Sequence, residues 1–205
     1  MIIGESGSGK STALRNFDAN EIGIFNIASK PLPFRNSLPK INGATYQTIV
    51  KALKNPKMKA YAIDDSQYLM AFESFEKANE TGYGKFTAMA VNFYNLVQFV
   101  IKSTPEDLLV YFLQHTEKTE DGRIKAKTLG KMLDSQLTLE GLFSIVLLCR
   151  TDGTRHWFET QSDGLTTAKS PMDMFDREID NDLKFVDQRI RKYWDLRGNE
   201  NVPTK

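Results

Sequence analysis

The sequence predicts an α/β domain in which helices cover both faces of a mainly parallel sheet, completed by a carboxyl-terminal hairpin and helix. Segments of extended, apolar character alternate with segments of helical periodicity along the 205 residues. A glycine-rich motif at residues 4–11 has the form that joins a strand to a helix. A second apolar run, residues 60–63, ends in two aspartates and is typical of a buried strand.

The motif at residues 4–11, G-x-x-x-x-G-K-[ST], predicts a loop that binds a nucleoside triphosphate, with ATP as the expected ligand. Its spacing lets several backbone N–H groups point at a phosphate at the head of a helix. Lys10 is expected to reach the β- and γ-phosphates, and the Ser11 hydroxyl to hold Mg²⁺. The alternative is a turn that caps a helix whose first turn is residues 12–15. The predicted nucleotide-binding residues are Gly4, Glu5, Ser6, Gly7, Ser8, Gly9, Lys10, Ser11 and Thr12.

Two aspartates follow the apolar run at residues 60–63. A strand placed there delivers Asp64 and Asp65 to its carboxyl end, where α/β proteins bind ligands. Asp64 is the expected carboxylate on the Mg²⁺ side, together with Ser11, because phosphate-loop proteins carry an acidic residue at this place. Asp65 stands where a catalytic base could polarise water, or alternatively where it would cap a helix at residues 66–70.

A third strand is expected at residues 108–113, before Gln114 and His115. If the strand ends there, Gln114 faces the ligand crevice, where its amide could sense the γ-phosphate or orient water. The alternative is an ordinary loop end. His115 is expected to do no more than form a hydrogen bond, and it is not predicted to be a metal ligand, because the only other histidine is His156.

The other expected elements complete one domain, residues 1–196. Three residues precede Gly4, fewer than the roughly five of a usual central strand, so the first strand is expected to be short or truncated. The prolines at 31 and 33 predict irregular backbone. Strands are expected at 22–27 and 154–159, helices at 48–54, 86–102 and 181–194, and a flexible tail at 197–205.

Composition limits the function classes. A hydrophobic content of 40% supplies a core for one domain, and a net charge of +1 leaves no overall attraction to nucleic acid or membranes. The single cysteine, Cys149, excludes an intramolecular disulfide and lies in an apolar run, so we expect an inert buried thiol. No stretch has the length of a membrane span, and a cytoplasmic location is expected.

A charged segment, residues 116–131, carries five basic residues against three acidic ones. Its sign and expected flexibility would suit contact with a nucleic-acid backbone, although charged loops are more often simply solvated. It lacks interleaved aromatic residues that would stack on bases. The candidate DNA-binding residues are Lys118, Arg123, Lys125, Lys127 and Lys131.

Over nearly its whole length, the chain resembles the RecA-like phosphate-loop ATPases encoded by phages and grouped with single-strand annealing proteins. The resemblance rests on the two motifs above and on the segments IDDSQYLM at 63–70, GKFT at 84–87, TLGKMLD at 128–134, AKSP at 168–171 and IDNDL at 179–183. It implies a three-layer RecA-like core and an ATPase, stimulated by DNA, that acts on single-stranded DNA in recombination or replication.

The resemblance also implies partners and roles. A homo-oligomer with ATP sites at subunit interfaces is expected, with single-stranded DNA and a single-strand-binding protein as partners. Gln114 would couple the γ-phosphate to the basic segment, and a basic residue from a neighbouring subunit would complete each site. Lys169 is the candidate for that residue and Arg155 the reserve, although Lys169 could equally be an ordinary loop lysine.

One departure from the RecA-like pattern is the lack of a glutamate after the strand that follows the phosphate-loop helix, where residues 28–30 are Ala-Ser-Lys. Asp65 is therefore the expected base, or else hydrolysis is slow. Two other functions remain open at this point: a small-molecule kinase whose lid is residues 116–131, and an ATP-dependent switch with little turnover. A kinase would require an acceptor pocket.

Overall fold

The structure is a computed structural model, and it describes residues 1–35, 37–82, 84–129 and 137–196. In this part of the chain nine strands form one mixed sheet, in the order β3-β2-β4-β5-β1-β7-β8-β9, with β6 paired to β5. The strands are β1 (Ile2–Gly4), β2 (Ile22–Asn26), β3 (Lys40–Asn42), β4 (Ala60–Asp64), β5 (Leu109–Lys118), β6 (Ile124–Ala126), β7 (Leu147–Thr151), β8 (His156–Glu159) and β9 (Glu178–Asp180).

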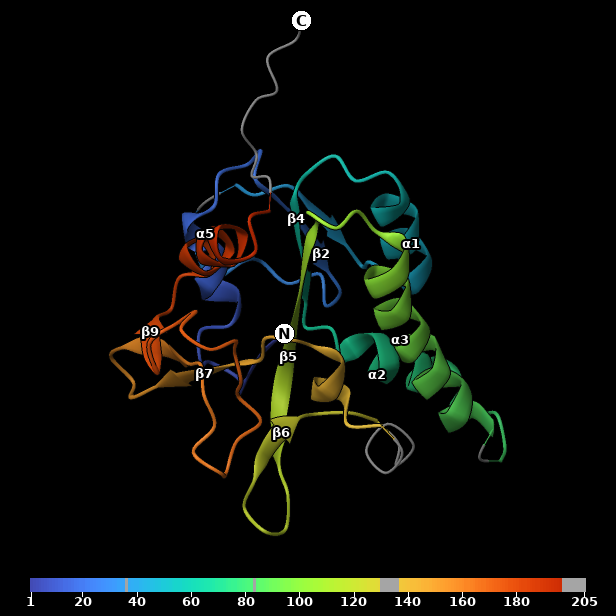
Figure 1. The fold of residues 1–205 in the computed structure, drawn as a ribbon. Helices are drawn as coiled ribbons and strands as arrows, with labels where there is room; N and C mark the ends of the chain where they lie inside the picture. The colour runs from blue at the N-terminus through green and yellow to red at the C-terminus, as the bar shows by residue number, and fades with distance from the viewer. Residues whose placement is uncertain (36, 83, 130–136, 197–205) are drawn as a thin grey trace, which may run out of the picture.

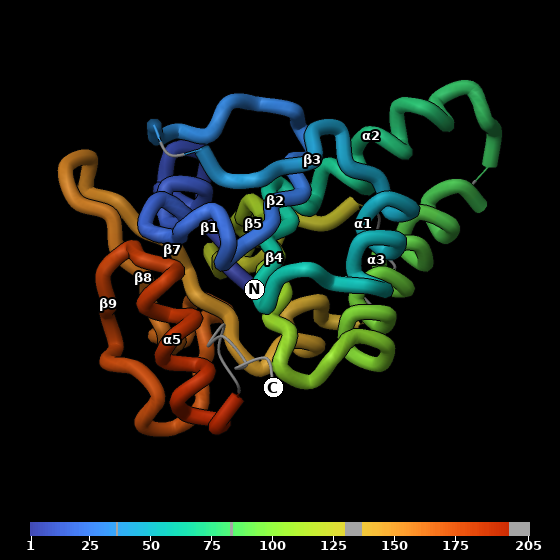
Figure 2. The backbone as a smooth tube through the Cα atoms, turned by 90° about the horizontal axis from the view of Figure 1, so that it is seen from above, coloured from blue at the N-terminus to red at the C-terminus, as the bar shows by residue number. Residues whose placement is uncertain are grey.

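Helices lie on both faces of this sheet (Figure 1; Figure 2). One face carries α1 (Tyr46–Lys54), α2 (Tyr68–Glu76) and α3 (Gly84–Ser103), and the other carries the short 3-10 helix η1 (Ser11–Asn16) and α5 (Leu183–Tyr193). A second 3-10 helix, η2 (Leu139–Leu142), precedes β7. The predicted α/β class, the mainly parallel sheet, and the carboxyl-terminal hairpin and helix are confirmed.

The register of the parallel strands brings their carboxyl ends together. Asn26 at the end of β2 lies opposite Asp64 at the end of β4, and Gly4 at the end of β1 lies opposite His115 in β5. β7 continues the parallel set beside β1, whereas β8 and β9 add antiparallel strands. Residues from four separate segments therefore meet at one edge of the sheet.

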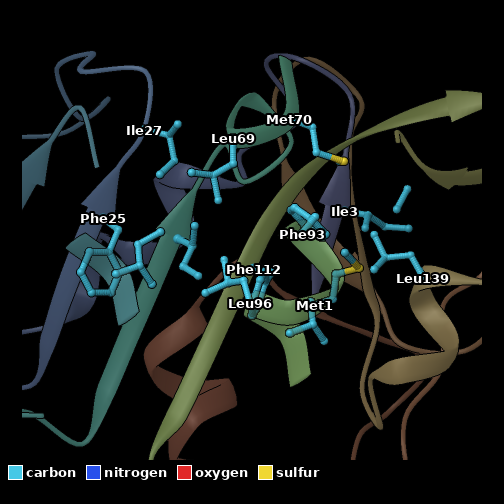
Figure 3. Close-up of a cluster of buried hydrophobic side chains, with 14 of the residues drawn as sticks. Met1, Ile3, Phe25, Ile27, Leu69, Met70, Phe93, Leu96, Phe112 and Leu139 are labelled. Atoms are coloured by element: carbon cyan, nitrogen blue, oxygen red, sulfur yellow. The ribbon is translucent and has the colours of Figure 1, made fainter. Parts of the chain in front are cut away.

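Two apolar clusters, one on each face, hold the sheet between the helices. Successive residues of a strand point to opposite faces, so Ile3 joins the cluster under α1, α2 and α3, whereas Ile2 joins the cluster under η1 and α5. Figure 3 shows the first cluster, where Phe112 of β5 lies beside Leu96 of α3. The Phe112 ring meets the Phe93 ring edge to face, with centroids 6.1 Å apart.

Most expected elements form with shifted ends. The helices predicted at 48–54, 86–102 and 181–194 are α1, α3 and α5, and the strand at 22–27 is β2. Asp182 caps α5 by accepting hydrogen bonds from the backbone of Lys184 and Phe185. The first strand is short, as expected, with three residues. None of the described helices is both long and apolar enough to cross a bilayer.

The expected end of the third strand and the expected loop after it are both wrong. β5 does not end at Leu113 but continues through Gln114 and His115 to Lys118. Beyond the main sheet it pairs with β6, so Thr116 lies opposite Ala126 and Lys118 opposite Ile124. This part of the basic segment is therefore a β-hairpin and not an irregular loop, because the apolar residues Ile124 and Ala126 bury their side chains under the strand. The expected tail at 197–205 lies outside the described residues.

Candidate functional site

The phosphate loop runs from the end of β1 into η1. Gly7 and Gly9 have φ angles of 79° and 100°, which side chains resist. A Cβ on Gly9 would also lie 2.9 Å from the Nδ1 atom of His156. Lys10 folds back across the loop, where its ammonium donates to the Gly4 and Glu5 carbonyl oxygens at 2.9 and 2.8 Å. The loop is thus held in a closed curve by its own lysine.

A cavity of about 360 Å³ lies over this loop, at the carboxyl edge of the sheet. The loop contributes Ser6, Gly7 and residues 9–12, and the end of β4 contributes both aspartates. The remaining walls come from residues far away in the sequence, which are Lys30, Pro31, Pro33, His115 and His156. The sequence-predicted loop and acidic pair therefore meet in one cavity, whereas Glu5 and Ser8 line a smaller neighbouring pocket.

Ser11 and Asp64 form the candidate magnesium position. The Ser11 hydroxyl donates to Asp64 Oδ1 at 2.7 Å. Burial raises the pKa of Asp64, and the Ser11 hydrogen bond opposes that rise. A hydroxyl and a carboxylate fit Mg²⁺, which takes few protein ligands and completes its shell with phosphate oxygens and water. Among the described residues, no group of three His, Cys, Asp or Glu side chains is placed to hold a metal ion.

Asp65 occupies the centre of a charged trio. Its Oδ2 lies 2.6 Å from the Lys30 ammonium, and its Oδ1 lies 3.2 Å from His115 Nε2. Burial by itself would raise the pKa of Asp65, but hydrogen bonds from His115 and Lys30 outweigh it and lower the pKa to about 2. Asp65 also has a positive φ of 57°, and strained backbone of this kind concentrates at functional sites.

The alternative role of Asp65 as a helix cap does not fit the structure. α2 begins at Tyr68 with Gln67 at the N-cap position, and the Asp65 carboxylate contacts Lys30 and His115. Only the Asp65 carbonyl oxygen serves the helix start, by accepting from the Tyr68 backbone at 2.9 Å. The carboxylate is therefore directed to the cavity and remains the candidate to position water.

Gln114 lies elsewhere than expected. Its side chain is fully buried and does not line the cavity; the neighbouring residue His115 does. The Gln114 amide donates to the Lys127 carbonyl oxygen at 2.6 Å, and its Oε1 accepts from the Ser66 hydroxyl at 3.0 Å. Gln114 thus connects the segment after the acidic pair to the backbone that follows β6. Its proposed coupling role stays a prediction.

Two cavity residues, Lys30 and His156, were missed as functional candidates. Lys30 follows β2, whose carboxyl end lies at the same edge as that of β4, so its place in a parallel sheet was the available signal. His156 had no comparable signal, because it arrives through the antiparallel hairpin β7–β8. Its Nδ1–H donates to the Ser8 carbonyl oxygen at 2.8 Å.

Cys149 is buried, as expected, and, like His156, it contacts the Ser8 carbonyl oxygen of the phosphate loop. Its thiol donates to the Ser8 carbonyl oxygen at 2.9 Å and accepts from the Asn181 amide at 3.1 Å. Burial raises the pKa of Cys149 to about 11, although the Ser8 contact acts in the opposite direction. At neutral pH the group is a protonated thiol, which agrees with a structural role and not with a nucleophile.

Three candidate DNA-binding residues, Lys118, Arg123 and Lys125, lie on the β5–β6 hairpin, which projects from the main sheet (Figure 1), whereas Lys127 follows β6 and donates its backbone N–H to His115. Lys118 and Lys127 are exposed. Lys125 pairs with Glu117 at 3.2 Å, and Arg123 pairs with Asp121 at 3.1 Å. These pairs reduce the positive charge that the hairpin presents. Lys131 lies outside the described residues.

The two candidates for a residue that acts on a neighbouring subunit differ in position. Lys169 exchanges backbone hydrogen bonds of 2.8 Å with Val146, just before β7, so it lies at the opposite end of the parallel strands from the phosphate loop. Arg155 precedes His156 on the cavity side, and its guanidinium lies 5.6 Å from the centroid of the Trp157 ring. Both positions are compatible with contact to another subunit, and Arg155 is the more exposed.

The chain matches no protein-family model, and a search of curated proteins finds no significant match. Its fold belongs to the α/β class, and its principal site is the cavity above the loop at residues 4–11. The function is therefore inferred from the chemistry of that site.

Proposed function

We propose that this protein binds ATP with Mg²⁺ and hydrolyses it, as a RecA-like ATPase that acts on single-stranded DNA in phage recombination or replication. The observation that carries the proposal is the meeting of Lys10, Ser11 and Asp64 in one cavity, with the Ser11 hydroxyl 2.7 Å from the Asp64 carboxylate. A cation, a hydroxyl and a carboxylate at the head of a glycine-rich loop are the groups that triphosphate binding requires.

Each side chain has a distinct task in this proposal. Lys10 exchanges the Gly4 and Glu5 carbonyl oxygens for phosphate oxygens, and the loop N–H groups bind the same phosphates. Ser11 and Asp64 hold Mg²⁺, which, when bound, neutralises charge on the β- and γ-phosphates. Asp65 orients the attacking water. Turnover then requires that Asp65 be released from at least part of its present ion pairing.

The sheet order supports a RecA-like three-layer core. β5 lies between β4, which ends in the acidic pair, and β1, which leads into the phosphate loop. The same strand carries His115 to the cavity and continues into the β5–β6 hairpin. A movement of His115 on nucleotide binding would therefore be transmitted along β5 to the proposed DNA-binding hairpin. Gln114, bonded to the Lys127 backbone, adds a second route.

The proposed partners follow from the RecA-like assignment. We infer a homo-oligomer in which each ATP site lies near a subunit interface, with single-stranded DNA bound along the hairpins and a single-strand-binding protein as a further partner. Lys118 and Lys127 would contact backbone phosphates, because both are exposed on the hairpin side of the molecule.

The test is ATP hydrolysis measured with and without single-stranded DNA, with Lys10→Ala as the control for contaminating ATPase. We expect turnover that DNA stimulates and that the variant lacks. Turnover that depends on Lys10 but is indifferent to DNA would contradict the DNA-directed part of the proposal. Turnover unaffected by the variant would contradict the nucleotide site.

A nucleotide-dependent switch with little turnover is the second candidate function. The observation in its favour is that both oxygens of Asp65 are already engaged, by Lys30 and by His115. Nucleotide binding without product formation would identify it. The small-molecule kinase has less support, because none of the described residues from 116 to 129 lines the cavity as a lid would.

Neutralising two lysines of the hairpin region should weaken DNA binding and reduce its salt dependence. For Lys118→Gln combined with Lys127→Gln, we expect the slope of log K against log salt to fall by about 1.4 for single-stranded DNA, because each lost phosphate contact removes about 0.7. Fluorescence anisotropy with a labelled oligonucleotide at several salt concentrations measures this. Lys192→Gln, an exposed lysine on α5, is the control. An unaltered slope would exclude the two lysines from the interface.

A further inference from the structure

The backbone of Lys30 is fixed beside the cavity by residues that precede and follow it. Its backbone carbonyl accepts a hydrogen bond of 2.7 Å from the amide of Asn26, a buried residue at the end of β2. The same amide donates to Asn42 at the end of β3, at 2.8 Å. Pro31 follows and restricts Lys30 to extended backbone. The turn that presents this lysine is thus fixed by the ends of two neighbouring strands.

The ammonium of Lys30 faces the cavity that also contains Lys10. It lies 2.6 Å from Asp65 Oδ2 and 5.6 Å from the centroid of the Tyr68 ring. Its side chain is 59% exposed, so the ammonium can move to a more highly charged anion, while Asp65, which is 7% exposed, keeps its contact with His115. Lys10 is hydrogen-bonded to the loop and Lys30 comes from the segment after β2, so two cations line one cavity.

We propose that Lys30 is a catalytic cation supplied by the same chain, which moves from Asp65 to the γ-phosphate when a nucleoside triphosphate binds. This inference rests on the proposed function. Water attacks the γ-phosphorus, the bond to the bridging oxygen breaks, and its electron pair leaves with ADP. Both protons of the water end on the released phosphate. Lys30 stabilises the charge on the transferred group, and Asp65, freed from Lys30, orients the water.

The proposal changes which subunit completes the site. A cation that comes from the same chain removes the need for a basic residue such as Lys169 from a neighbour, so the turnover number at saturating ATP should not depend on protein concentration. It also gives a role to Lys30 in the segment after β2, where residues 28–30 contain no glutamate, and Asp65 serves with water.

The test compares Lys30→Gln with the wild type by calorimetry and by steady-state kinetics. We expect the affinity for ADP to stay within about twofold, because ADP lacks the phosphate that Lys30 contacts. The affinity for ATPγS should fall about 10-fold, and that for ADP with aluminium fluoride about 100-fold, since a transition-state contact is worth more. The turnover number should fall by about 100-fold or more with a smaller change in KM, and Lys30→Arg should restore part of it.

Lys59→Gln is the matched control, because it removes another lysine paired with an aspartate, Asp107, away from the cavity. Equal losses for ADP and ATPγS, an unchanged turnover number, or a wild-type turnover number that rises with protein concentration would each overturn the proposal. Thermal melting of Lys30→Gln and Lys30→Arg checks that both fold. If the wild type binds and hydrolyses ATP in a manner that requires Lys10, and Lys30→Gln has the same affinities and turnover number, only this inference fails. If the wild type does neither, the proposed function fails as well.

Discussion

Replacement of Lys10 by alanine should remove nucleotide binding from the protein. The ammonium is buried in the loop, where burial lowers its pKa and the nearby Asp65 opposes that effect. Charged hydrogen bonds contribute roughly 1.5–3 kcal/mol each, so the loss of two phosphate contacts predicts an affinity for ATP lower by at least about 100-fold. Calorimetry with MgATP measures the change directly, independently of turnover.

The same substitution should leave the fold intact. Glu5, whose carbonyl oxygen Lys10 now satisfies, is exposed, so water can replace that hydrogen bond, and Lys10 belongs to neither apolar cluster. Lys192→Ala on the surface of α5 is the control for the loss of a lysine. An affinity for ATP in Lys10→Ala equal to that of the wild type would disprove the phosphate-loop assignment.

Asp64→Asn should remove the dependence of nucleotide binding on Mg²⁺ and reduce turnover by about 100-fold or more. The asparagine can still accept the Ser11 hydrogen bond, but it lacks the charge that a divalent cation needs. Because burial already raises the pKa of Asp64, the neutral side chain should leave the melting temperature of the nucleotide-free protein equal or slightly higher. Titrations of ATP with Mg²⁺ and with EDTA separate the two effects.

Asp65→Asn is the matched comparison, since it neutralises the adjacent carboxylate. We expect it to keep the Mg²⁺ dependence of binding, lose turnover, and melt at a lower temperature, because it breaks the contacts with Lys30 and His115. If the two variants lose Mg²⁺ dependence equally, the assignment of Asp64 alone to the metal position is wrong.

Much of the fold could be predicted from local patterns. The helices α1, α3 and α5 have apolar residues at helical spacing, and β4 is an apolar run that ends in charge, so each signal lies within one segment. The phosphate loop is also local, because its glycines and Lys10 act within a few residues. Ser11 and Asp64 could be predicted to lie together, because each belongs to a motif that predicts binding of the same nucleotide and its Mg²⁺.

The remaining site residues depend on distant parts of the chain. The extent of β5 could not be predicted, because the strand beyond Leu113 is polar: Gln114 and His115 pair with β1, and residues 116–118 pair with β6. That extension buries Gln114 and turns His115 to the cavity. Lys30 and His156 reach the cavity through the order and direction of strands in the sheet, a property that no single segment of the sequence contains.

The anchoring of the Ser8 carbonyl oxygen has a consequence for how the protein folds. Its two donors, Cys149 and His156, are separated from it by 141 and 148 residues. Contacts of such sequence separation form late, because they require closure of most of the chain. The phosphate loop can therefore take its final shape only after the β7–β8 hairpin has been made. Nucleotide binding should be among the last properties gained in refolding.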